Sequence, residues 1–114
     1  MRKDYETVNL YRKPDSKYIT AVGDFYGEAN DGYIDPKERF CITVGYGIIK
    51  YNMTEPFEGF MYDRDTTQWI EIGNDKDNVE ECDKIEEVTD THVTVSFEGG
   101  DIRRFKLSDL SKEA

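Results

Sequence analysis

The sequence has few of the residues that build disulfide frameworks and metal centres. Its 114 residues include 2 cysteines, Cys41 and Cys82, and a single histidine, His92. Two cysteines are too few for a disulfide scaffold, and reduced thiols are the default state in a cytosolic protein. Two cysteines at unrelated spacing and one histidine also cannot form a Cys/His zinc site without help from carboxylates. We therefore expect no bound metal and no cofactor.

Long apolar runs and basic clusters are missing as well. No segment approaches the ~20 apolar residues of a membrane helix, and residues 1–6 contain no apolar signal segment. The formal net charge is −10, from 25 acidic and 15 basic residues. Binding to nucleic acid or to an anionic membrane needs a clustered basic face, so we expect neither. The charge suits a cytoplasmic protein with a basic protein partner.

Patterns that indicate catalysis are few. Cys41 and His92 would form a nucleophilic pair only if their strands were neighbours, and neither lies where thiolates are usually activated. Residues 45–47, Gly-Tyr-Gly, follow a strand pattern but precede no helix pattern, unlike a phosphate-binding loop. The acidic pairs within 63–65 and 75–77 could supply oxygen ligands to Mg²⁺ or Ca²⁺. The pair within 75–77 lacks the ligand spacing of an EF-hand loop, so both pairs are better interpreted as solvated loop carboxylates. We therefore expect that this chain is not an enzyme.

One stretch predicts the centre of the fold. At this length we expect a single domain, residues 1–114. Residues 39–51 are the longest run with few charges, and they predict the central strand of a small sheet. Large side chains share one face of that strand at period two: Phe40, Ile42, Val44, Tyr46 and Ile48. The other face carries Gly45 and Gly47, so we expect it to be nearly bare, with a bulge or coil there.

Two hairpins are predicted from the alternation of apolar residues on either side of the central stretch. Residues 5–11 and 18–26 pair with Leu10 opposite Ile19. Residues 60–72 fold back on themselves.

In this second hairpin Tyr62 lies opposite Ile70. Trp69 then points to the less apolar face, where it is either packed under a loop or exposed for contact. Burial is the commoner outcome for tryptophan.

The C-terminal residues predict a further hairpin. Residues 91–97 alternate well, and 98–101, Glu-Gly-Gly-Asp, are strong turn residues. A three-residue loop with a left-handed glycine sets Val95 opposite Phe105 and keeps the apolar side chains on one face. Residues 93–110 resemble the last hairpin of SH3-like or Tudor-type barrels. The fold class expected is all-β, with at most one short helix, as a small antiparallel sheet curled into a barrel or half-barrel, of which an SH3-like barrel is a variant.

The segment 71–90 differs in composition from the rest of the chain. It holds nine acidic residues and only Lys76 and Lys84 as basic ones. The part from 74 to 84 has no strand alternation; the spacing of Val79 and Cys82 allows a turn or two of helix. We predict that this segment connects structural elements and is either a solvated charged face or a docking surface for a cationic partner.

The leading hypothesis is a bacterial immunity-type protein that inhibits a basic partner, such as a nuclease toxin, by occluding its active site. Acidic side chains would replace phosphates and an aromatic side chain would anchor the contact. The binding residues predicted are Glu80, Glu81, Asp83, Glu86, Glu87, Asp75, Asp77, Trp69 and Tyr62. An SH3-like or Tudor-like module that reads peptides in an aromatic groove is the alternative, followed by a small domain without catalytic activity.

Overall fold

The fold of the chain was analysed in a computed structural model. It describes residues 2–4, 7–12, 17–24, 29–53, 59–60, 66–72 and 81–110. These residues contain ten strands and no helix, which confirms the all-β expectation. The strands are β1 (Arg2–Asp4), β2 (Thr7–Arg12), β3 (Lys17–Asp24), β4 (Asp31–Ile34), β5 (Phe40–Gly45), β6 (Gly47–Asn52), β7 (Trp69–Ile72), β8 (Cys82–Val88), β9 (His92–Phe97) and β10 (Ile102–Lys106).

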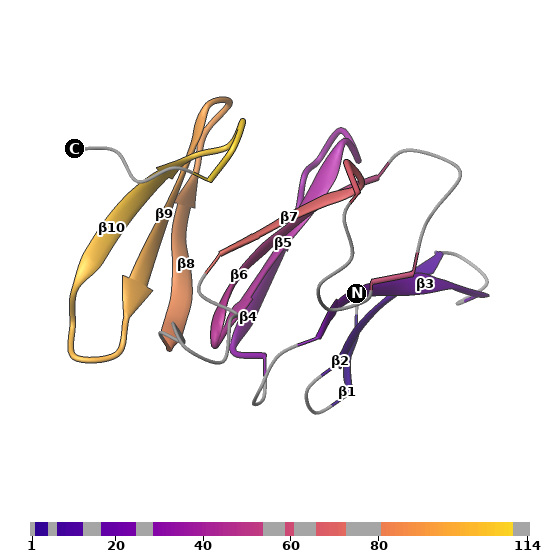
Figure 1. The fold of residues 1–114 in the computed structure, drawn as a ribbon, viewed down its shortest axis with the longest axis horizontal. Coiled ribbons are helices and arrows are strands. Elements are labelled where there is room, and N and C mark those ends of the chain that lie inside the picture. The colour runs from indigo at the N-terminus through magenta and orange to yellow at the C-terminus, as the bar shows by residue number, and fades with distance from the viewer. Residues whose placement is uncertain are drawn as a thin grey trace.

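The strands form three antiparallel sheets that lie side by side (Figure 1). The N-terminal sheet has the order β1-β2-β3, the middle sheet β4-β5-β6-β7 and the C-terminal sheet β10-β9-β8. Strand β8 lies against β4 and β5, and β3 lies against β6. In the described part of the chain these sheets are not joined into one closed sheet, so the curled barrel stays a prediction.

The predicted central strand is two strands. The chain reverses at Tyr46, so that β5 and β6 pair with each other and Gly45 lies opposite Gly47. Gly47 has a φ of 115°, a conformation that favours glycine. The glycines that suggested a bare strand face are therefore the residues that permit a tight reversal, and the prediction of one continuous strand over 39–51 was wrong.

The middle sheet is buried on both faces. One face forms a first core with the C-terminal sheet, and Phe40, Ile42, Val44 and Ile48 lie in it. The predicted grouping is confirmed for these four side chains, but the fifth predicted member, Tyr46, is half-buried at the reversal and belongs to neither core.

The other face of the middle sheet is not bare. It forms a second core whose buried members are Leu10, Ala29, Cys41, Ile49, Tyr51, Phe60 and Trp69. The reversal at Tyr46 supplies these large side chains, because it places Ile49 beside Thr43 and Tyr51 beside Cys41. A strand covered on both faces reads as a continuous apolar run, which explains the composition of this stretch.

The N-terminal hairpin (β2 and β3) and the C-terminal hairpin (β9 and β10) form with registers that differ from the predicted ones. In the N-terminal sheet Leu10 lies opposite Thr20 rather than Ile19, because β2 and β3 contain two register shifts. In the C-terminal sheet Val95 lies opposite Arg103 rather than Phe105. The predicted C-terminal register differs from the observed one by two residues. Because side chains alternate between the two faces of a strand, the apolar side chains still share one face.

The C-terminal loop has the predicted length. The Phe97 amide donates to the Asp101 carbonyl over 2.7 Å, which leaves Glu98, Gly99 and Gly100 between them. The φ angles of Gly99 and Gly100 are 94° and 91°. The loop starts one residue earlier than the apolar pattern suggested, and this offset causes the register difference.

The hairpin predicted within residues 60–72 lies partly outside the described residues, Tyr62 among them, so its pairing of Tyr62 with Ile70 stays a prediction. Strand β7 pairs with β6, with Tyr51 opposite Trp69 and Ile48 opposite Ile72. Phe60 lies outside the strands but packs against Trp69 with ring centroids 4.9 Å apart. The described partner of β7 is therefore β6, which the sequence pattern did not predict.

Candidate functional site

The predicted binding residues are divided by the structure. Glu81, Asp83, Glu86 and Glu87 lie at or on β8, and all but Glu81, which is half-buried, are exposed. Trp69 is 4% exposed and its ring stacks on Tyr51 at 5.9 Å. The buried alternative for Trp69 is therefore the one observed, and its ring is not a surface anchor. The remaining predicted residues lie outside the described residues: Glu80, Asp75, Asp77 and Tyr62.

Strand β8 gathers its acidic side chains on the surface because it is irregular. Its pairing with β9 shifts register between Cys82 and Lys84 and again between Ile85 and Glu87. These bulges turn Cys82, Ile85 and Val88 toward the first core, although they are three residues apart. The two residues between each of these core positions are all exposed.

The outer edge of β8 is held by side chains that precede or begin β4. The Asn30 Nδ2 amide donates to the Cys82 carbonyl oxygen over 2.7 Å. The Ile85 backbone amide donates to Asp31 Oδ2 over 2.9 Å. An antiparallel bridge between Tyr46 and Glu81 adds to this attachment. Side chains thus satisfy backbone groups that an edge strand would otherwise expose.

Three carboxylates meet where β8 begins and β9 ends. Glu81, Asp83 and Glu98 line one surface depression of about 290 Å³, and we call these three residues the acidic site. The Glu98 amide donates to the Glu81 carbonyl over 3.1 Å, which holds the loop after β9 against the residue before β8. A side-chain hydrogen bond with Glu81 raises the pKa of Glu98 above its ordinary value; the negative charge of Glu81, burial and the charge of Asp83 add to the effect.

Within the described residues no lysine or arginine forms an ion pair with the acidic site. Lys84 pairs with Glu86, Nζ to Oε2 at 3.6 Å. Arg103 is held by Asp101 at 2.7 Å and stacks over the Phe97 ring at 4.1 Å. The acidic site therefore carries a concentrated negative charge that the described cations leave unbalanced.

Sequence analysis missed Glu98 as a site residue. It was assigned only to a turn, and its sequence distance from Glu81 gives no sign that the two side chains meet. The predicted C-terminal hairpin is the signal that could have found it. If the acidic segment forms a strand that pairs with β9, the acidic start of that strand lies beside the loop after β9, where Glu98 is. Most of the described part of the acidic segment is strand, in β7 and β8.

The arithmetically possible Cys41–His92 pair is not assembled. Cys41 lies in the second core, on the face of the middle sheet opposite to the one that the C-terminal sheet covers. Burial raises the pKa of the Cys41 thiol to about 12. The His92 ring Nδ1 lies 2.7 Å from Thr91 Oγ1. Among the described residues, no three cysteine, histidine or acidic side chains are grouped so that they could hold a metal ion.

Comparison with known proteins gives no relative from which to take a function. The sequence matches no protein-family model and no curated protein. The described residues contain no helix with the length and apolar character needed to span a membrane.

Proposed function

We propose that this chain is an inhibitor-type binding protein that works in the cytoplasm and docks a basic protein through its acidic site. The observation that carries the proposal is the set of three carboxylates, Glu81, Asp83 and Glu98, crowded around one depression, where no described lysine or arginine forms an ion pair with them. A lysine or arginine of a partner would relieve their mutual repulsion. A nuclease toxin is the partner class favoured, since its active site must present cations to phosphates.

The mechanism is occlusion with carboxylates in the place of phosphates. Concentrated charge steers a cationic surface toward the site and speeds its association. The hydrogen bonds from Asn30 and to Asp31 fix the backbone of β8, so little backbone ordering remains to oppose binding. The exposed Glu86 and Glu87 extend the same charge along β8.

An SH3-like barrel that binds peptides is the lesser proposal. Such a module needs aromatic side chains exposed in a groove. Tyr51, Phe60 and Trp69 instead pack on one another in the second core. This packing leaves the acidic site as the better-supported binding surface.

The test is inhibition of a basic nuclease, beginning with any nuclease encoded beside this chain and continuing with a panel of basic nuclease domains. Glu81→Lys and Glu98→Lys should each weaken inhibition at least tenfold, about 1.4 kcal/mol. Glu38→Lys is the matched control, because Glu38 is exposed in the β4–β5 turn, away from the bridge between Tyr46 and Glu81. Inhibition that the three variants weaken equally, or a panel with no inhibited nuclease, would overturn the proposal.

A further inference from the structure

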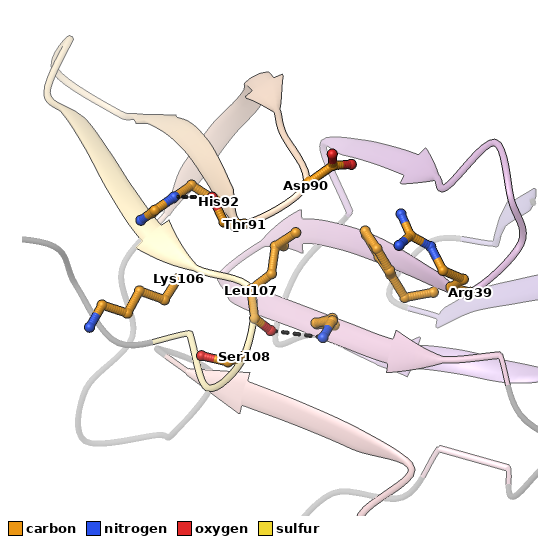
Figure 2. A pocket seen from close by; sticks show the side chains of 9 residues that line it. Arg39, Asp90, Thr91, His92, Lys106, Leu107 and Ser108 are labelled. Atoms are coloured by element: carbon orange, nitrogen blue, oxygen red, sulfur yellow. Dashed lines mark hydrogen bonds between the residues drawn. The ribbon is translucent and has the colours of Figure 1, made fainter.

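A second cavity lies at the other end of the C-terminal sheet. Strand β9 runs from this cavity at His92 toward the acidic site beyond Phe97. The cavity has a volume of about 430 Å³, within the range of small-molecule sites. It is lined by Arg39, Phe40, Lys50, Asp90, Thr91, His92, Lys106, Leu107 and Ser108 (Figure 2). In a chain of net charge −10, this lining holds three lysine or arginine side chains and one carboxylate.

Lys50 is the most unusual residue in this lining. Its Nζ donates to the Leu107 carbonyl oxygen over 2.7 Å and lies 5.3 Å from the centre of the Phe40 ring. No carboxylate in the described part of the chain forms an ion pair with it. Burial lowers the pKa of Lys50, and the positive charge of Arg39 lowers it further. Lys50 is half-buried, and an ammonium that is partly removed from water without a counter-charge is costly, so an anion that reached it would be bound favourably.

The other charges of the cavity are placed differently. Arg39 is already held by Asp35, with Nε to Oδ2 at 2.7 Å and Nη2 to Oδ1 at 3.2 Å. Figure 2 shows Asp90 on the side of the cavity where Arg39 lies, and His92 and Lys106 directed away from both. Lys50 is therefore the cation to which an entering anion would bind.

We propose that this cavity binds a small organic monoanion, a carboxylate carried on a flat apolar body. The carboxylate would accept hydrogen bonds from the Lys50 ammonium, which has three donors and uses one on Leu107. The apolar body would lie against Phe40 and the Leu107 side chain, both of which are buried in the first core. A dianion such as phosphate is disfavoured, because Asp90 repels it and Lys106, the other lysine of the lining, is directed away from the cavity (Figure 2).

The experiment is an NMR titration of the whole chain with benzoate, followed through the backbone amides of His92, Leu107 and Ser108. Benzamide tests the need for the negative charge, and inorganic phosphate tests the preference for a monoanion. Benzoate should bind at least tenfold more tightly than benzamide or phosphate. Equal affinity for benzoate and benzamide, tighter binding of phosphate, or no shift at these amides would overturn the proposal, and this comparison needs no variant.

Lys50→Met tests the residue. It keeps an unbranched apolar side chain over Phe40, one atom shorter, and removes the charge, and it should weaken benzoate binding at least tenfold. Lys84→Met is the matched control, because Lys84 is exposed on β8 and does not line the cavity. Unchanged benzoate binding by Lys50→Met, or an equal loss with Lys84→Met, would contradict the assignment.

Discussion

Replacement of Thr43 by valine should stabilise this protein. Thr43 lies in β5, is 1% exposed, and its hydroxyl oxygen has no hydrogen-bond partner among the described residues. An unsatisfied buried hydroxyl costs about 1–3 kcal/mol. Valine has nearly the same shape and the same preference for strands, so it removes the polar atom without leaving a cavity. We expect the free energy of unfolding to rise by about 1–2 kcal/mol. This is the lower part of the cost of the unsatisfied hydroxyl, because the neighbouring side chains are packed against threonine.

The assay is urea and thermal unfolding of the wild-type and variant chains. At an unfolding entropy of about 2.1 cal/mol/K per residue, 1 kcal/mol corresponds to a change of about 4 °C in Tm for 114 residues. Thr43→Val should therefore raise Tm by about 4–8 °C. Thr94→Val is the control, because Thr94 is a half-exposed residue of β9, where the change should stay within about 0.5 kcal/mol. A Thr43→Val chain no more stable than the wild type would refute the claim that both faces of the middle sheet are dry core.

Three further predictions follow from charge and burial. The pKa of Glu98 is raised in the folded chain, so ionisation of Glu98 destabilises the fold above that pKa and has no effect below its ordinary value of 4.5. Glu98→Gln should therefore raise the unfolding midpoint at pH 7 but not at pH 3. A side-chain hydrogen bond from Arg39 lowers the pKa of Asp35 from 3.8 to about 2; Asp35→Asn should lower stability at pH 6, and that difference should disappear as the pH falls through 3.8 toward 2. Cys41 and Cys82 are fully buried, so a thiol reagent at pH 8 should label neither in the folded chain and both in urea; rapid native labelling would contradict the core assignment.

The fold could be predicted from the sequence as far as period-two alternation reaches. The alternation of Phe40, Ile42 and Val44 identified one core face, and the glycines 99–100 identified the last turn. The reversal at Tyr46 could not be read in this way. Apolar residues continue through it without a polar turn, because both strands that it joins are buried on two faces.

Strand β8 shows a second limit of sequence patterns. Its two bulges give the core positions Cys82, Ile85 and Val88 a spacing of three, which is closer to the helical period than to that of a strand. Spacing of this kind, between Val79 and Cys82, is why residues 74–84 suggested a turn or two of helix. Bulges arise from the pairing partner, so the segment alone carries no signal for them.

The candidate site was predicted in part for a related reason. The acidic residues of β8 are visible in the composition, but the contact between Glu81 and Glu98 depends on the pairing of β8 with β9. The cavity at Lys50 was not predicted at all, since its residues come from four separate places in the chain. Sites built from distant segments need the fold before they can be recognised.

The most direct test of the proposed function is the salt dependence of the association rate between this chain and a nuclease that it inhibits. The rate should fall at least tenfold between about 50 and 300 mM salt, because steering by the acidic site is screened. Glu81→Lys and Glu98→Lys should slow association at low salt and flatten this dependence, whereas Glu38→Lys should follow the wild type. An association rate indifferent to salt and to the reversals at Glu81 and Glu98 would contradict the account.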